Sequence, residues 1–505
     1  MNQQLKESVF PRNRMTLVYV FALFAGSAVA YNNGLARTPQ MGWNNWNALG
    51  CNVSEDLLLD TSQKLLDLGL RDVGYNYVVL DDCWSGGRGA DGKLFEDETK
   101  FPSGMKAISD RIHDMNLLFG MYSSAGEMTC AKYPGSLDWE QQDAQTFALW
   151  GVDYLKYDNC YSAGRHGSPQ ISYQRFKAMS TALNETGRPI LYSMCSWGED
   201  LVHTWGVSIA NSWRISGDIY DSFSRPDVFC SCNDPRDPMC INYGSHCSVL
   251  YILNKVAPYA DRGMPGGWHD LDMLEVGHGG MTDDEYKAHF AMWAILKSPL
   301  LIGADLRTLS ASALTILNNP AIIALSQDAG NFPPHRIAVD YNVKKDRFGV
   351  GETHVWANEL FNGDQVVAFL NAADEDVEMS SSLEEIFVSD GPGGSSSKVS
   401  LSWDVYDLWA SRMSNEVAGR LIKASNEKDW EALEHIHSEA DWYNATQIPY
   451  QEGLAQDNRK LFGERVKTVK AGGILSHKVR CHSAAIFRLR PVREEIGSSA
   501  ERDEL

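Results

Sequence analysis

Two aspartates on well-separated segments have the residue type and the setting that glycosidic bond cleavage needs. Asp158 ends the segment Tyr-Leu-Lys-Tyr-Asp, and Asp218 ends the segment Trp-Arg-Ile-Ser-Gly-Asp. Such cleavage uses two carboxyl groups, one that attacks the sugar and one that protonates the leaving oxygen. Aspartates at strand ends also cap helices or pair with a nearby base, here Lys156 or Arg214. Other parts of the sequence are needed to distinguish the catalytic interpretation from the structural one.

Short apolar strands alternate with helix-like segments from Pro39 to about residue 330. We expect eight strands, at 40–46, 76–83, 118–123, 154–159, 190–196, 213–218, 266–272 and 298–304. The helix-like segments between them include 55–68, 104–115, 138–150, 170–186 and 283–297. This alternation is typical of an α/β fold, the (β/α)8 TIM barrel. An open doubly wound sheet is the alternative, but no Gly-rich phosphate loop follows the first strand.

Polar residues gather at the C-terminal ends of the expected strands, where barrel enzymes build their active sites. They are Asp81, Asp82, Tyr122, Lys156, Asp158, Ser196, Asp218 and Asp272. Helix capping alone is a poor explanation of so many coincidences, so this pattern favours a catalytic site.

After residue 330 the alternation of strand-like and helix-like segments gives way to strand-like segments joined by turns. Segments 354–360 and 365–371 are strand-like and are joined by a hairpin signal, Phe-Asn-Gly-Asp. Further strands are expected at 399–408 and 483–490. We therefore divide the chain into a signal peptide (1–30), a catalytic barrel (31–330), an antiparallel β-sandwich (331–490) and a disordered tail (491–505). The sandwich is either a carbohydrate-binding module or a support, and the lack of an evident aromatic platform favours a support.

The two ends of the chain indicate the secretory route. Arg12 and Arg14 precede an apolar run that ends in Ala-Val-Ala at residue 30, which is typical of a cleaved secretory signal rather than a membrane anchor. The last four residues, Arg502 to Leu505, resemble a retrieval signal of the endoplasmic reticulum. We expect a secreted protein, with retention in that compartment as the alternative.

The composition of the chain excludes some classes of binding partner. The chain has 505 residues and a formal net charge of −21, so nucleic acid and anionic membrane surfaces would repel it. We expect a carbohydrate ligand, and no membrane contact in the mature form. The sequence makes no prediction of oligomeric state.

Ten cysteines in a secreted chain predict disulfides. Four of them are close enough in sequence for a zinc site, but an oxidising compartment favours two nested disulfides; they are Cys230, Cys232, Cys240 and Cys247. Three sequons predict N-glycosylation, at Asn52, Asn184 and Asn444.

Several long motifs together resemble glycoside hydrolase family 27, the α-galactosidases and α-N-acetylgalactosaminidases, and most of all the secreted fungal α-galactosidases. The motifs are residues 34–44, 81–84, 156–158, 197–200, 214–218 and 270–273, together with the cysteine-rich loop 230–247. The resemblance runs from about Gly34 to Arg490 and implies a barrel followed by an antiparallel β domain, with no cofactor and no metal.

The resemblance also implies roles. Asp158 would be the nucleophile and Asp218 the acid/base of a retaining hydrolase. We expect Lys156 to lower the pKa of Asp158, and burial or the first carboxylate to raise that of the acid. The implied substrate-binding residues are Trp46, Asp81, Asp82, Tyr122, Lys156, Ser196, Trp197, Arg214 and Asp272. The implied disulfides are Cys51–Cys83, Cys130–Cys160, Cys230–Cys247 and Cys232–Cys240, which leaves Cys195 buried and free and Cys481 unassigned.

One position departs from many α-galactosidases of this family. Ser196 stands where they carry a glutamate that contacts the sugar 2-hydroxyl, and a serine there makes room for an acetamido group. Small or polar residues also occur at this position in fungal α-galactosidases, so galactose is the favoured sugar and N-acetylgalactosamine the alternative. A β-L-arabinopyranosidase is a third possibility. A non-catalytic galactose-binding protein is a possibility of another class, but it would be expected to lack one of the two carboxylates.

Overall fold

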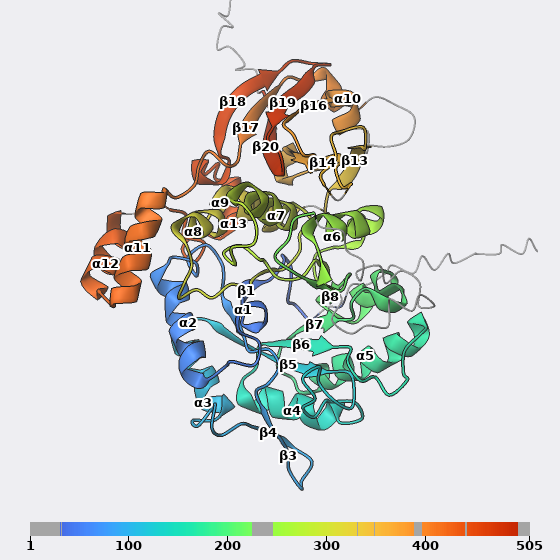
Figure 1. Cartoon of the computed structure of the whole chain (residues 1–505), viewed down its shortest axis with the longest axis vertical. Helices are drawn as coiled ribbons and strands as arrows, with labels where there is room; N and C mark the ends of the chain where they lie inside the picture. The colour runs from blue at the N-terminus through green and yellow to red at the C-terminus, as the bar shows by residue number, and fades with distance from the viewer. Residues whose placement is uncertain are drawn as a thin grey trace, which may run out of the picture.

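The computed structural model describes residues 31–492 except for residues 32, 225–245, 331, 348, 388–395 and 440–441. Its largest sheet holds eight parallel strands in the order β11-β8-β7-β6-β5-β2-β1-β12 (Figure 1). The bounds are β1 (Met41–Asn44), β2 (Tyr77–Val79), β5 (Leu118–Ser124), β6 (Tyr154–Asp158), β7 (Leu191–Cys195), β8 (Ser212–Arg214), β11 (Trp268–Asp270) and β12 (Leu300–Ile302). All eight expected strands are present.

The sheet closes on itself just beyond β11. Leu274 N–H donates to Leu301 O at 2.7 Å, and Gly303 N–H donates to Leu274 O at 2.9 Å. These bonds join the two edge strands, so the eight strands form a barrel and the open-sheet alternative is wrong.

Side chains alternate between the inside and the outside of the barrel, as the pleat of a strand requires. In β2, Tyr77 and Val79 belong to a small apolar cluster inside the barrel, with Tyr154 and Leu191 of other strands. Val78, between them, belongs to the large cluster shared with the surrounding helices. Burial on both faces explains why these strands read as short, nearly continuous apolar runs.

Helices follow the strands and shield the barrel. They are α1 (Trp46–Leu49), α2 (Glu55–Asp67), α3 (Met105–Asp114), α4 (Glu140–Trp150), α5 (Pro169–Glu185), α6 (Val249–Val256), α7 (Asp283–Ile295), α8 (Ala311–Leu317) and α9 (Pro320–Ser326). Their starts carry the expected chemistry. Ser54 caps α2 by accepting from Leu57 N–H, and Thr282 forms a capping box with Glu285 at the start of α7. Short β pieces extend the loops: β3 (Ser85–Arg88), β4 (Leu94–Glu96), β9 (Asp218–Ile219) and β10 (His246–Cys247).

A second, antiparallel sheet lies above the barrel in Figure 1, in the order β13-β14-β15-β20-β17-β18. Its strands are β13 (His335–Asp340), β14 (Thr353–Glu359), β15 (Gln365–Asn371), β17 (Trp403–Asp407), β18 (Glu464–Val469) and β20 (Ser483–Pro491). The pair β16 (Val377–Ser382) and β19 (Ile474–Val479), with α10 (Leu383–Ile386), packs on it around a core that contains Phe369, Trp403 and Leu475. The expected hairpin joins β14 and β15.

The chain between β17 and β18 is helical, and it lies within the region 331–490 that we expected to form a β-sandwich. It forms α11 (Asn415–Glu427), α12 (Trp430–Glu439) and α13 (Tyr450–Ala455). Ser414 caps α11, and Ala418, Leu421 and Ala424 recur at the three-residue spacing of one helix face. That face packs against α8 and α2 of the barrel, so burial on a neighbouring element, rather than on the sheet, selects the helix.

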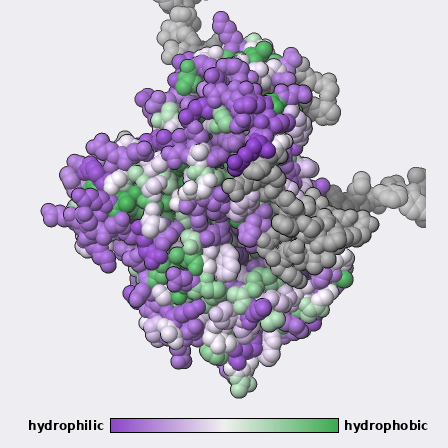
Figure 2. Space-filling model, in the orientation of Figure 1, coloured by the Kyte–Doolittle hydropathy of each residue, from purple (hydrophilic) through white to green (hydrophobic). Residues whose placement is uncertain are grey.

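Some of the predicted features fall on residues that the structure does not describe. The signal peptide, residues 493–505 of the tail and Cys230, Cys232 and Cys240 lie outside the described residues. Among the helices that are described, none combines the length and apolar character needed to cross a bilayer. The face drawn in Figure 2 is mostly hydrophilic, with hydrophobic residues in small separate patches.

Candidate active site

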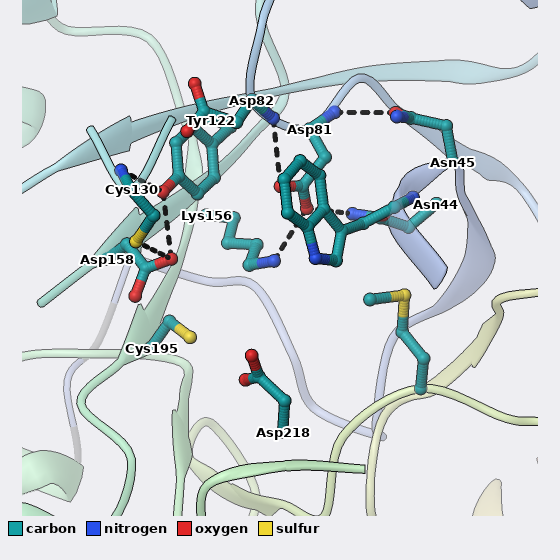
Figure 3. Close-up of polar contacts among 12 residues, drawn as sticks. Asn44, Asn45, Asp81, Asp82, Tyr122, Cys130, Lys156, Asp158, Cys195 and Asp218 are labelled. Atoms are coloured by element: carbon teal, nitrogen blue, oxygen red, sulfur yellow. Dashed lines mark hydrogen bonds and ion pairs between the residues drawn. The ribbon is translucent and has the colours of Figure 1, made fainter. Parts of the chain in front are cut away.

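The strand ends bring the expected site residues to one end of the barrel. Lys156 and Asp158 lie on β6, Tyr122 on β5 and Arg214 on β8. The others follow strands: Trp46 after β1, Asp81 and Asp82 after β2, Ser196 and Trp197 after β7, Asp218 at the start of β9, and Asp272 after β11. Figure 3 shows the side chains of Asp81, Lys156, Asp158 and Asp218 directed toward one common space.

Asp158 lies deep in this space and is 6% exposed. Tyr122 Oη donates to Asp158 Oδ2 at 2.9 Å, and the N–H of Asn159 donates to Oδ1 at 2.8 Å. Cys130 Sγ lies 3.3 Å from Oδ2. The carboxylate is therefore held in one orientation, and its donors favour the ionised form.

Lys156 lowers the pKa of Asp158, as expected, but this effect does not decide the outcome. Burial has the larger effect and raises the pKa to about 6, because removal from water outweighs the attraction of the ammonium group. Asp218 adds to this rise, since a second carboxylate nearby disfavours a second negative charge. In turn, burial disfavours the Lys156 ammonium, but Asp81, Cys195 and Asp158 outweigh that effect and raise its pKa well above the usual value.

Asp218 lies nearer the solvent, with 38% of its side chain exposed. Arg214 Nη2 donates to Asp218 Oδ1 at 3.0 Å and lies 2.7 Å from Asp272 Oδ2. Asp272 Oδ2 also accepts from the N–H of Ile219, the residue after Asp218, at 2.8 Å. Arg214 and Asp272 thus fix both the side chain and the backbone of Asp218. The pKa of Asp272 is raised by burial, against the opposing effect of Arg214.

Asp81 and Asp82 are buried and rigidly held. Lys156 Nζ donates to Asp81 Oδ2 at 2.6 Å, and Asn44 Nδ2 donates to the same oxygen at 2.8 Å. Asp82 accepts from the N–H of Cys83 at 2.7 Å and from the N–H of Ala131 at 2.8 Å. A carboxylate oxygen has two lone pairs, so both aspartates can accept further hydrogen bonds from a ligand's hydroxyl groups.

Trp46 lies two residues after β1, and Ser196 and Trp197 directly follow β7. Trp46 is half-buried, and its backbone N–H donates to Asn44 Oδ1 at 2.8 Å. Ser196 is buried, and its hydroxyl donates to the carbonyl of Arg214 at 3.4 Å. Trp197 is half-buried, with a φ of +55°, and contributes to the loop between β7 and β8.

Three further residues, for which the sequence predicted no role, also lie in the site. Asn44 supports Asp81 as described, and Asn45 Oδ1 accepts from the N–H of Asp81 at 2.8 Å. Asp270 lines the same cavity as Lys156 and Arg214, and burial raises its pKa to about 6. All three lie at or just after the C-terminal end of a barrel strand, so the strand-end argument could have found them.

The cysteines follow the expected pattern where they are described. Cys51 pairs with Cys83 and Cys130 with Cys160, as the resemblance implied. Cys195 is free and buried, and burial raises its pKa well above the usual value. Cys481 is also free. Cys247 is disulfide-bonded, while Cys230, its implied partner, lies outside the described residues.

One group of described residues has the spacing of metal ligands: Cys130, Asp158 and Cys160. The two sulfur atoms are bonded to each other, so they offer no thiolate, and a single carboxylate does not make a metal site. Of the three sequon residues, Asn52 and Asn184 are exposed and Asn444 is partly exposed.

The arrangement can bind a polyhydroxylated ligand and act on it with two carboxyl groups. One carboxyl group is deep and held by two donors, and the other lies toward the solvent beside a buried arginine. This is the division that nucleophilic attack and proton transfer to a departing group require.

Comparison with known proteins gives consistent matches over nearly the whole chain. A family model described as "Alpha galactosidase A" matches residues 38–328, and one described as "Alpha galactosidase C-terminal beta sandwich domain" matches residues 350–427. The α-galactosidase of Saccharomyces mikatae is 50% identical over 486 residues, which are 95% of this chain and 100% of that protein.

Solved structures agree in fold. The α-galactosidase of Saccharomyces cerevisiae, solved with raffinose, has a TM-score of 0.85 and 48% identity, covering 92% of this chain and 100% of that chain. The α-galactosidase I of Mortierella vinacea has a TM-score of 0.72 and 39% identity, covering 91% of this chain and 98% of that chain.

Proposed function

This chain belongs to the α-galactosidase family, and we propose that it removes terminal, non-reducing α-D-galactosyl residues in two displacement steps with retained configuration. The observation that carries the mechanism is the facing pair of carboxyl groups, the buried Asp158 and the more exposed Asp218 (Figure 3).

In the first step, ionised Asp158 attacks the anomeric carbon from the face opposite the leaving group while Asp218 gives its proton to the departing glycosidic oxygen. Tyr122 and the N–H of Asn159 hold Asp158 in the attacking orientation. In the second step, a water molecule enters from the solvent side, and Asp218 takes its proton as the water opens the galactosyl–Asp158 ester. The exposed position of Asp218 suits a group that meets first the leaving alcohol and then water.

Sugar recognition uses the fixed acidic groups of the pocket. Asp81 and Asp82 accept hydrogen bonds from the O4 and O6 hydroxyls, and Lys156 and Arg214 serve other hydroxyls. Trp46 and Tyr122 form pocket walls, Trp197 and Ser196 lie on the side of the 2-hydroxyl, and Asp272 lies near the leaving group.

The substrates proposed are oligosaccharides such as raffinose, galactomannans and galactolipids; raffinose accompanies the similar Saccharomyces cerevisiae enzyme. The buried Ser196 leaves N-acetylgalactosamine as the alternative sugar. We propose a secreted, N-glycosylated enzyme that binds neither nucleic acid nor membrane, supported by the signal-like N-terminus and the net charge of −21. Recognition of Arg502 to Leu505 would instead retain it in the endoplasmic reticulum.

Azide trapping tests the roles of the two carboxyl groups. Asp158→Gly should lose activity on every substrate, and azide should restore turnover by entering the vacated face to give β-galactosyl azide. Asp218→Gly should lose raffinose hydrolysis but still react with dinitrophenyl α-galactoside, whose leaving group needs no proton, and azide should then give α-galactosyl azide.

The stereochemistry decides between the assignments. The opposite pair of azide products would reverse the two roles, and a loss below about tenfold in either variant would contradict the mechanism. The wild-type enzyme should hydrolyse nitrophenyl α-galactoside faster than nitrophenyl α-N-acetylgalactosaminide, and the reverse order would favour the alternative sugar.

A further inference from the structure

A second cleft lies away from the active site, between α2 of the barrel and the turn that joins α11 to α12. Its volume is about 620 Å³. One wall carries Asp56 and Asp60 of α2, the other carries Lys428 and Trp430, and Arg111 and Arg307 also line it. None of these residues contributes to the catalytic site. The model of the family's C-terminal domain ends at residue 427, just before this turn.

The two walls are fixed relative to each other by a buried polar network. Lys64 Nζ of α2 donates to Ser425 Oγ at 2.9 Å and to Asn426 Oδ1 at 2.7 Å. Ser425 Oγ in turn donates to Asp67 Oδ2 at 2.6 Å. Because Lys64, Ser425 and Asp67 are buried, this network holds α11 on α2, and the cleft needs no rearrangement before it binds.

Polar groups in the cleft are open to a ligand. The side chains of Asp56, Asp60, Lys428 and Trp430 make no hydrogen bond or ion pair with any residue that the structure describes. Trp430 is 53% exposed, which is unusual for a residue with so large an apolar ring. An exposed ring flanked by free donors and acceptors suits a ligand with both an apolar face and hydroxyl groups.

The charges of the cleft select the class of ligand. A phosphate or sulfate would meet Asp56 and Asp60, and a divalent cation would meet Lys428 and Arg307. A neutral sugar avoids both conflicts. Its C–H face can pack on the indole ring while its hydroxyls donate to the carboxylates and accept from the ammonium group.

We propose that this cleft is a second, non-catalytic binding site for a neutral oligosaccharide, in which a sugar ring stacks on Trp430. The sugar has two possible sources. One is a polysaccharide from the surroundings, and the other is a glycan on the chain's own Asn52, which is exposed and lies two residues before Ser54 of the cleft. The proposal does not depend on the catalytic roles given above.

Affinity electrophoresis in gels that contain soluble galactomannan tests this site, with excess galactose present to occupy the active site. Wild-type enzyme and Asn52→Gln are the parents, and Trp430→Ala is introduced into each. Trp139→Ala is the matched control, since Trp139 is 42% exposed and lies outside the cleft. Retardation of both parents indicates an external polysaccharide, whereas retardation of Asn52→Gln alone indicates that the chain's own glycan fills the cleft.

In either case Trp430→Ala should weaken the apparent Kd roughly tenfold, and Trp139→Ala should leave it unchanged. The kcat/KM for nitrophenyl α-galactoside should be the same in all variants, so a failure of the second site is distinguishable from a failure of the catalytic proposal. The proposal is overturned if neither parent is retarded, or if Trp430→Ala is retarded as strongly as its parent. A change of molecular mass in light scattering, without a change in retardation, would assign this face to contact between copies of the chain and would equally overturn it.

Discussion

The acidity of Asp158 links its burial to the pH dependence expected of the enzyme. Burial raises its pKa to about 6, and a protonated carboxyl group cannot attack the sugar. We therefore expect kcat/KM to fall as the pH drops through about 6. Tyr122→Phe removes a donor that favours the ionised form, so it should move this acidic limb to higher pH by about one unit.

The measurement is the pH profile of kcat/KM for nitrophenyl α-galactoside. Tyr192→Phe is the control, because Tyr192 is also fully buried but donates its hydroxyl to the carbonyl of Phe176 instead. Its acidic limb should stay in place. An unchanged acidic limb in Tyr122→Phe, or an equal shift in both variants, would show that this limb does not report the ionisation of Asp158.

The sequence could predict which residues gather in the site, but not how each one behaves. Parallel strands place their C-terminal ends at one end of a barrel, so Asp81, Asp158 and Asp218 were predictable from strand positions alone. The direction of the Asp158 pKa was not, because it depends on how completely β5, β6 and β7 exclude water from that carboxylate. The bond from Arg214 to Asp272 likewise joins two segments that are far apart in sequence and become neighbours only because β8 and β11 pair in the sheet.

Among the helices and strands, too, some were predictable from the sequence and others were not. The eight barrel strands were predictable because each one is a short buried run that is bounded by turns, and its neighbours repeat the pattern. The helices α11 to α13 were not, because they lie within a stretch of strands and their apolar faces are buried on the barrel. Residues 415–427 have a helical period, but the surface on α2 and α8 against which α11 packs is distant in sequence.

The loop between β5 and α4 carries one cysteine of a disulfide and contacts two carboxylates of the site, Asp158 and Asp82. Its Cys130 lies against Asp158, and the N–H of the next residue, Ala131, donates to Asp82. Cys130→Ser combined with Cys160→Ser should cost about 3 kcal/mol of stability and should lower kcat/KM, because a small displacement of the loop moves two site carboxylates.

Cys51→Ser combined with Cys83→Ser is the matched control, since the sequence separations are 32 and 30 residues. Both pairs should lose similar stability in chemical denaturation. At a temperature where both are folded, kcat/KM for nitrophenyl α-galactoside should be roughly tenfold lower in the Cys130 pair, because Cys130, unlike Cys51 and Cys83, lies against Asp158. Equal rates in the two pairs would show that the loop does not position the nucleophile.

The barrel and the C-terminal sheet are joined by buried polar contacts as well as by packing. Arg488 of β20 is 1% exposed, and its Nε lies 3.0 Å from Asp364 Oδ2. Its Nη2 lies 3.7 Å from Asp328 Oδ2, and Asp328 belongs to the segment that follows α9 of the barrel. Both carboxylates are buried, so this one guanidinium offsets charge on both sides of the junction. We infer that the sheet and the barrel unfold together.

Arg488→Met tests this inference, since it would leave two buried carboxylates without their shared cation. Removing one partner from a buried ionic group is expected to cost about 3–5 kcal/mol, because the remaining charge is neither solvated nor paired. Arg490→Met is the matched control, as Arg490 lies two residues along the same strand and also pairs with Asp364, but 23% of its side chain is exposed. The free energy of unfolding should fall by about 1 kcal/mol or less in Arg490→Met, because solvent screens an exposed pair.

In denaturant titrations followed by both tryptophan fluorescence and activity, Arg488→Met should show one transition, shifted to lower denaturant for both signals. If activity survived after the fluorescence change, or if the two variants lost the same stability, the guanidinium would not couple the two parts, and the sheet would be an independently folding attachment to the barrel.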